Sequence, residues 1–323
     1  SSKRVIRVLL LLLLISNMIC GTNFTNATNA TNLTITNLLN FPSKLSTMKP
    51  RSLSLLLPSS FAIDTADLRG KTAKIGQIAR AASVFCVDRI VVYRDPDLNE
   101  MKLIETILAY AETPQYLRRH IFPLTDDLRY AGAIPPLRTP HHPLDAEKIV
   151  VGAIRAGLVV RVHDTGSWVD IGFERPAFLD AQLHRGERVN VIVTSQKPLK
   201  ARQVRRDEIA GYWGYTVERA ASLGDALVRS GEVTAIATSR YGTPIDLDLL
   251  TEIGVACEAE DVLIVLGPPH KGIHEIMEEE NVLMSKFDYV LNVLPDQGTE
   301  TVRVEEAAVA TLAILNMVLC RSS

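Results

Sequence analysis

The sequence has few cysteines and almost no excess of either charge. Its four cysteines lie far apart and form no CxxC pair, so neither a disulfide framework nor a cysteine-ligated metal site is expected. The formal net charge over 323 residues is only −2, which argues against a surface that neutralises many phosphates. Hydrophobic residues nevertheless make up 47% of the chain, which is enough for one large core or two domains.

Familiar catalytic motifs are also missing. The chain has no G-x-G-x-x-G dinucleotide fingerprint, no H-E-x-x-H and no G-x-S-x-G. Gly267 to Gly272 imitates a P-loop, but Ile273 and His274 stand where the lysine and the hydroxyl side chain should be. His270 and His274 are four residues apart without an evident partner ligand, so no metal site is expected there.

The first 47 residues differ from the rest of the chain. Three basic residues precede a short apolar run at 9–15, which is the layout of a secretory signal peptide and is too short to cross a membrane. N-glycosylation sequons follow at Asn23, Asn26, Asn29 and Asn32. One interpretation is therefore a secreted glycoprotein. We favour another, in which residues 1–47 are translated upstream DNA, Met48 is the true start and the native protein is cytoplasmic.

Residues 48–137 alternate between strand and helix patterns. Apolar runs predict strands at 53–58 and 87–93, and the spacing of apolar residues predicts helices at 67–85 and 99–119. This alternation is typical of a parallel sheet with covering helices. Four prolines between residues 133 and 143 then mark a boundary.

Residues 138–198 change to a β pattern. Short alternating segments with glycine turns predict a small barrel of the OB type, inserted into the α/β domain. Its aromatic residues Trp168, Phe173 and Phe178 are either core residues or platforms on which bases stack. The basic run that follows is as consistent with a solvated face as with an RNA contact. The residues predicted to bind RNA are Lys197, Lys200, Arg202, Arg205 and Arg206.

The α/β pattern resumes in residues 199–323. A helix is predicted at 216–229, and strands are predicted at 234–239, 262–266 and 289–294. These strands end in loops, and such strand ends are where an α/β sheet builds a ligand crevice. The loops hold no obvious nucleophile, which favours a site that grips a reactive cofactor mostly through backbone groups. The last helix, at 305–319, is apolar around most of its circumference, which suggests a subunit interface.

Three segments at these strand ends resemble the motifs of the SPOUT class of RNA methyltransferases. They are Ala237-Thr-Ser-Arg240-Tyr-Gly242, Gly267-Pro-Pro-His-Lys-Gly272 and Asn292-Val-Leu-Pro-Asp-Gln-Gly-Thr-Glu-Thr301 with its continuation to Glu306. With the inserted barrel they resemble one branch of that class, which is archaeal and eukaryotic. Eukaryotic members of the branch are linked to N3-methylation of a ribosomal-RNA uridine. The resemblance covers residues 48–319.

The resemblance implies a fold, a cofactor and an assembly. The fold is an α/β SPOUT domain with a parallel sheet and a C-terminal trefoil knot, and the cofactor is S-adenosylmethionine, bound in a bent shape. The assembly is a homodimer with the last helix in its interface. The residues implied to bind the cofactor are Leu266, Gly267, Leu291, Asn292, Gly298, Thr299 and Val302.

Individual residues of the three loops receive expected roles. Gly267, Gly272 and Gly298 would allow a close approach of the backbone where a Cβ would collide. Arg240 is the candidate for stabilising the transition state at uracil O2 or O4, or for binding the substrate phosphate, and otherwise forms a surface ion pair. Asn292 either anchors a ligand or caps a turn. No general base is identified.

The sequence predicts S-adenosylmethionine-dependent methylation of an RNA base, with uridine N3 of ribosomal RNA as the first choice. The alternative is an RNA-binding or ribosome-assembly protein that keeps a vestigial cofactor pocket. Residues 1–47 hold four basic side chains and no acid, so the remainder has 31 basic and 37 acidic residues and a net charge of −6. That charge is unusual for an RNA enzyme, although local clusters can still form a positive face. No membrane partner is expected.

Overall fold

The computed structural model describes residues 52–143, 150–258 and 260–319. The predictions made for residues 1–47 lie outside the described residues and stay predictions.

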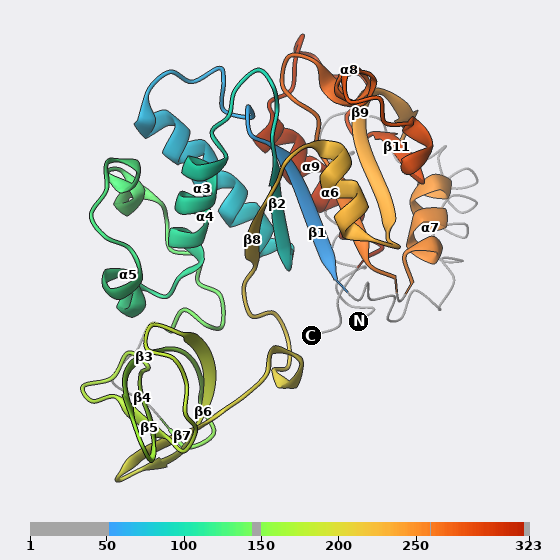
Figure 1. Cartoon of the computed structure of the whole chain (residues 1–323). Helices are drawn as coiled ribbons and strands as arrows, with labels where there is room; N and C mark the ends of the chain where they lie inside the picture. The colour runs from blue at the N-terminus through green and yellow to red at the C-terminus, as the bar shows by residue number, and fades with distance from the viewer. Residues whose placement is uncertain (1–51, 144–149, 259, 320–323) are drawn as a thin grey trace, which may run out of the picture. The chain divides into compact units, whose positions relative to one another are not determined.

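Six parallel strands form one sheet in the order β11-β9-β10-β1-β2-β8 (Figure 1). Their bounds are β1 (Leu53–Pro58), β2 (Arg89–Tyr93), β8 (Thr216–Ala220), β9 (Thr234–Pro244), β10 (Val262–Val265) and β11 (Tyr289–Asn292). Every residue of β1 and β10 is buried, as expected of central strands covered on both faces. Strands from both sides of the insertion share this sheet, which confirms the predicted interrupted α/β domain.

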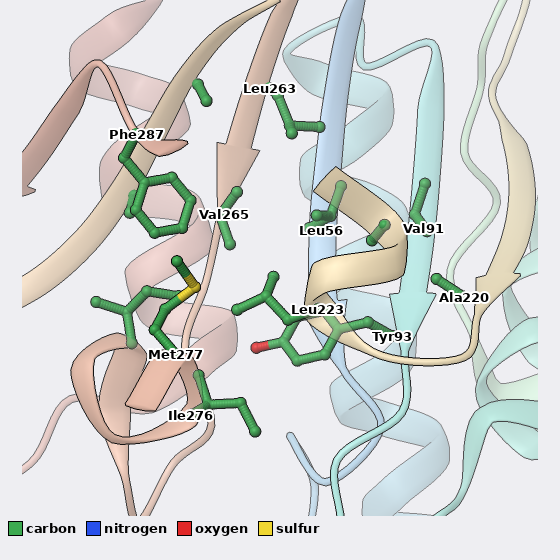
Figure 2. Packing of buried hydrophobic residues seen from close by; sticks show 14 residues of the cluster. Leu56, Val91, Tyr93, Ala220, Leu223, Leu263, Val265, Ile276, Met277 and Phe287 are labelled. Carbon is green, nitrogen blue, oxygen red and sulfur yellow. The ribbon is translucent and has the colours of Figure 1, made fainter. Parts of the chain in front are cut away.

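Helices cover the sheet on both faces. On one face, α6 (Leu223–Ser230) and α8 (Gly272–Glu279) bury Leu223, Ile276 and Met277 against the strand residues drawn in Figure 2. On the other face, α3 (Leu68–Val84) contacts α9 (Val304–Leu315). Buried apolar area of this kind contributes on the order of 25 cal/mol per Å², so the interleaved core fixes where the strand ends lie.

Two predicted helices differ from the structure. The one predicted at 99–119 is two helices, α4 (Met101–Glu112) and α5 (Gln115–Ile121). Pro114 causes the break, because a proline disfavours helical geometry in the preceding residue, and Thr113 is extended with ψ 129°. The one predicted at 216–229 is also wrong in its first part, where residues 216–220 pair with β2 as the edge strand β8. Here strand pairing outweighs a helix-like spacing.

A closed five-stranded barrel lies in the chain between β2 and β8, with the order β3-β4-β5-β7-β6. Its strands are β3 (Ile154–His163), β4 (Gly166–Asp170), β5 (Ala177–Leu179), β6 (Arg188–Gln196) and β7 (Leu199–Gln203). Their inward valine, leucine, isoleucine and alanine side chains form a core of their own. The predicted small barrel is therefore confirmed, but β7 carries it beyond residue 198, where the sequence analysis ended it.

An ion pair between the buried Glu112 and the exposed Arg188 joins α4 to β6 of the barrel. The Glu112 carboxylate accepts hydrogen bonds of 2.6 and 3.0 Å from the two terminal guanidinium nitrogens of Arg188, and Nε2 of the fully buried His141 lies 3.0 Å from Glu112 Oε1. Burial acts to raise the pKa of Glu112, but His141 and Arg188 together hold it below its usual value. The carboxylate therefore stays ionised at neutral pH, which keeps this polar contact between the barrel and α4 intact.

Candidate functional site

A cleft lies at the carboxyl ends of β9, β10 and β11, the three strands nearest one edge of the sheet. Three loops supply most of its lining, and the first turns of α8 and α9 supply the rest. The lining residues are 238–241, 266–272, Glu275, 291–294, Gln297, 300–302, Val304 and Ala307. The structure thus brings together the three strand ends that the sequence analysis singled out. Carboxyl ends of parallel strands are the usual ligand-binding edge of an open α/β sheet.

The first loop is a bulge inside β9. Val290 of β11 pairs with Ala237, but the next residue, Leu291, pairs with Thr243, so residues 238–242 leave the ladder. A Cβ on Gly242 would lie only 2.6 Å from the carbonyl oxygen of Val290, and glycine is therefore needed where the strand returns to β11. This bulge carries Arg240 to the cleft.

The second loop runs from β10 to α8 and is tightly folded. A Cβ on Gly267 would lie 2.6 Å from the backbone nitrogen of Ile273 and 2.7 Å from the carbonyl carbon of Gly272. Gly272 itself has a φ of +77°, which glycine adopts without strain. The buried Tyr93 hydroxyl donates a 2.7 Å hydrogen bond to the carbonyl oxygen of Leu266, and this bond fixes the start of the loop.

The third loop, after β11, is tied to the first by one side chain. Asn292 Nδ2 donates to the carbonyl oxygen of Arg240 at 2.9 Å, and Asn292 Oδ1 accepts from the backbone N–H of Leu294 at 3.1 Å. Asn292 therefore caps its turn, as one of the two interpretations expected. Farther along, Gln297 Nε2 donates to the carbonyl oxygens of Thr299 and Glu300 at 2.9 and 3.1 Å.

The predicted cofactor residues divide into two groups. Those that line the cleft are Leu266, Gly267, Leu291, Asn292 and Val302. Gly298 and Thr299 belong to the third loop but are not among the lining residues. A Cβ on Gly298 would meet no heavy atom within 4 Å, so the packing of the chain does not require glycine there.

Two cations of the cleft differ in how they are paired. Lys271 Nζ lies 2.8 Å from Glu279 and 3.0 Å from Asp97, and its hydrogen bonds with Glu279 and Asp97 raise its pKa above the usual range. It is therefore a fully protonated structural cation. Arg240 forms no salt bridge to any residue that the structure describes, and its guanidinium lies 4.6 Å from the centre of the Tyr241 ring. The alternative of a surface ion pair for Arg240 is thus not observed in this part of the chain.

Several lining residues escaped the sequence analysis. Tyr241, Glu275, Gln297 and Glu300 all line the cleft, yet none stands out in the sequence. Glu275 lies in the first turn of α8, and the other three lie on loop segments whose path residue spacing does not reveal. Glu305 is different. It lies in the first turn of α9, as expected, but it is buried with Oε1 3.3 Å from Lys74 Nζ and does not line the cleft.

The predicted RNA-binding run lies along and around β7, not at the cleft. Arg205 pairs with Asp207, and Arg202 lies 3.5 Å from Glu208, so part of its positive charge is neutralised locally. Arg206 donates to backbone carbonyl oxygens. Lys197 and Lys200 are exposed and form no salt bridge to a described residue.

Two further expectations concern metals and membranes. Across residues 52–143, 150–258 and 260–319, no group of three or more histidine, cysteine, aspartate or glutamate side chains is placed to hold a metal ion. Over the same ranges, no helix combines the length and the apolar character that crossing a bilayer requires.

A parallel sheet with looped strand ends around a cleft, and a small barrel inserted between its two halves, is the architecture of an α/β ligand-binding enzyme domain. The chain belongs to a family described as "Putative RNA methyltransferase", whose model matches residues 52–315. The family resemblance of the three motifs is therefore confirmed.

Individual relatives agree with this membership. The chain is 32% identical over 311 residues to the 28S rRNA (uridine-N(3))-methyltransferase of Homo sapiens, covering 83% of this chain and 78% of that protein. It is 37% identical over 284 residues to a protein of Halobacterium salinarum, covering 82% of this chain and 98% of that one. A solved S-adenosylmethionine-bound rRNA methyltransferase from Sinorhizobium meliloti matches with 9% identity and a TM-score of 0.37, covering 85% of this chain and 59% of that chain. That structural similarity is too low to carry an argument.

Proposed function

We propose that this protein transfers the methyl group of S-adenosylmethionine to N3 of a uridine in ribosomal RNA. The observation that carries the proposal is the convergence of three motif loops on one cleft in a chain of this family. The substrate choice is supported by the human and mouse relatives, which are named 28S rRNA (uridine-N(3))-methyltransferases and are 32% and 31% identical to this chain.

The cleft has the chemistry that this cofactor requires. Leu266, Leu291 and Val302 offer apolar contacts for an adenine ring, and the adjoining loop backbone offers donors and acceptors for its edge. Gln297 and Thr301 add polar groups at the third loop. When bound, the cofactor supplies a methyl group that its sulfonium has already activated. The protein must hold the acceptor in line with it and help the N3 proton leave to solvent.

Arg240 is the proposed catalytic side chain. N3 of uracil becomes a good nucleophile only when it loses its proton, and negative charge then spreads to O2 and O4. A guanidinium beside one of these oxygens stabilises that charge. Arg240 fits this role because it lines the cleft, is exposed and has no carboxylate partner among the described residues.

We also propose that the protein is a homodimer with α9 in its interface. One side of α9 is buried in the monomer, whereas Val309 is 44% exposed and Met317, just beyond the helix, is 60% exposed. Val309→Glu should therefore shift the mass in solution from twice 35.6 kDa to the monomer mass. Val228→Glu on α6, where Val228 is 75% exposed, is the matched control and should leave the dimer intact. A wild-type monomer would refute this interface.

The C-terminal trefoil knot stays a prediction of the resemblance.

The proposed reaction is tested by nucleoside mass spectrometry. Ribosomal RNA from cells that lack the gene should lose one 3-methyluridine, and the wild-type gene should restore it. Purified protein should methylate that RNA in the presence of S-adenosylmethionine. If the protein binds the cofactor and RNA but no modified nucleoside is lost, the proposal fails in favour of an assembly protein with a vestigial pocket.

A further inference from the structure

One outward-facing row of side chains crosses the barrel. Cross-strand pairing places Arg161 of β3 opposite Trp168 of β4, and Trp168 opposite Phe178 of β5. Phe178 in turn pairs with Lys200 of β7, and Lys200 pairs with Ser195 of β6. All five strands of the barrel thus contribute to the row, although its members are scattered over about forty residues of sequence.

The alternation of the strands points this row away from the barrel core. Val169, Ala177, Leu179 and Ala201, which are sequence neighbours of Trp168, Phe178 and Lys200, all belong to the buried core cluster. Successive side chains of a strand lie on opposite faces, so Trp168, Phe178 and Lys200 lie on the outside. Trp168 and Phe178 are half-buried, and Arg161 and Lys200 are exposed.

The ends of the row coincide with irregularities in the strands. The β3–β4 register shifts between Val159 and Arg161, and the β6–β7 register shifts between Val193 and Ser195. Bulges of this kind re-aim the side chains that follow them. Both shifts come directly before a row member, so the local geometry aligns this one row.

The two rings form one aromatic surface. The centroids of Trp168 and Phe178 are 5.3 Å apart with an interplanar angle of 64°. A Cβ on Gly166 would lie 2.8 Å from the Phe178 ring, so this glycine lets Phe178 lie against the backbone of β4. A cation stands on either side, and neither Arg161 nor Lys200 has a salt-bridge partner within the described ranges. Arg202 and Arg205 of the same basic run, in contrast, are paired with carboxylates.

We infer that this row, Arg161-Trp168-Phe178-Lys200, is a binding platform for single-stranded RNA. Unpaired bases stack on the two rings, and the flanking cations contact the phosphates on either side. Paired strands fit less well, because their bases are not free to stack on a protein ring. The inference rests on the proposed function, in which the substrate is RNA. Of the basic run that the sequence predicted to bind RNA, this inference keeps only Lys200.

The first test uses Trp168 as its own reporter. The chain has two tryptophans, and the other, Trp213, lies outside the row and donates to Asn190 Oδ1 at 2.8 Å. In the full-length Trp213→Phe protein, a short single-stranded oligouridylate should quench the remaining fluorescence saturably. Adding Phe178→Ala should weaken its binding by about tenfold, since one base–aromatic stack is lost.

Matched variants separate stacking from folding. Phe173→Ala removes an exposed phenylalanine that lies outside the row, and it should leave the affinity unchanged. If Phe178→Ala fails to fold, Phe178→Leu keeps an apolar side chain over Gly166 without a ring and should weaken binding to the same degree. An absence of quenching, or equal affinity in the Phe178 and Phe173 variants, would overturn the inference.

The cations are tested by salt dependence. Lys200→Gln and Arg161→Gln should each reduce the slope of log affinity against log salt by roughly 0.7, the value per phosphate contact for single strands. Arg202→Gln, which removes a cation already paired with Glu208, is the control and should leave the slope unchanged. Equal slopes in all three variants would refute the phosphate contacts. These titrations do not involve methyl transfer, so a platform that binds RNA in a protein without activity would refute the proposed reaction and leave the platform standing.

Discussion

Replacing Arg240 with alanine should lower kcat by about 10²–10³-fold, the usual cost of removing one donor that stabilises developing negative charge. Affinity for S-adenosylmethionine should stay at the wild-type value, because the guanidinium packs on Tyr241 and holds no other part of the cleft by a salt bridge to a described residue. Single-turnover methylation of ribosomal RNA measures the first quantity, and calorimetry measures the second.

The chain offers a close control for this variant. Arg129 also lies over the ring of the next residue, with its guanidinium 5.8 Å from the centre of Tyr130, but it does not line the cleft. Arg129→Ala should therefore keep full turnover. If Arg240→Ala also keeps it, the catalytic assignment is wrong. If both variants lose activity together, the effect comes from stability and not from chemistry.

Gly267→Ala should both destabilise the protein and abolish tight cofactor binding. The added methyl group would collide with the backbone of Gly272 and Ile273, which cannot rotate away as a side chain can. Overpacking of this kind costs about 1–3 kcal/mol. The strained loop also shifts the cleft wall, and a loss of about 1.4 kcal/mol in binding is already a tenfold weaker affinity. Thermal unfolding and calorimetry with S-adenosylmethionine report the two effects separately.

Gly298→Ala is the matched variant that separates cofactor binding from stability. Because a Cβ there meets open space, the unfolding temperature should not fall. If the cofactor contacts Gly298, as the motif resemblance implies, the affinity for S-adenosylmethionine should drop without any loss of stability. Wild-type affinity would remove Gly298 from the binding residues. A Gly267→Ala protein with wild-type stability and affinity would contradict the packing argument itself.

The sequence predicted the central strands and the strand ends well, because these depend on local apolar runs and on glycine and proline. β1 and β10 are buried runs without alternation, and they were recognised from that alone. One edge strand was missed. β8 carries a helix-like spacing that its pairing with β2 overrides.

The contents of the cleft were predicted less completely, for a physical reason. Residues 238–242 leave the β9 ladder. A local sequence pattern cannot predict this bulge, because the partner strand lies some fifty residues later. The ion pairs of Lys271 and Arg205 likewise depend on where other segments fold. The row on the barrel needed the registers of four strand pairs, whereas the sequence analysis could only leave Trp168 and Phe178 open between core and platform.

The Asn292 amide has a consequence for the order of events in the cleft. It holds the main chain of Arg240 while its own residue lies beside Leu291, on the wall proposed for the adenine. A cofactor bound against that wall would also restrict the main chain at Arg240 through this hydrogen bond. Binding would then be ordered: S-adenosylmethionine binds first and positions Arg240 for the RNA.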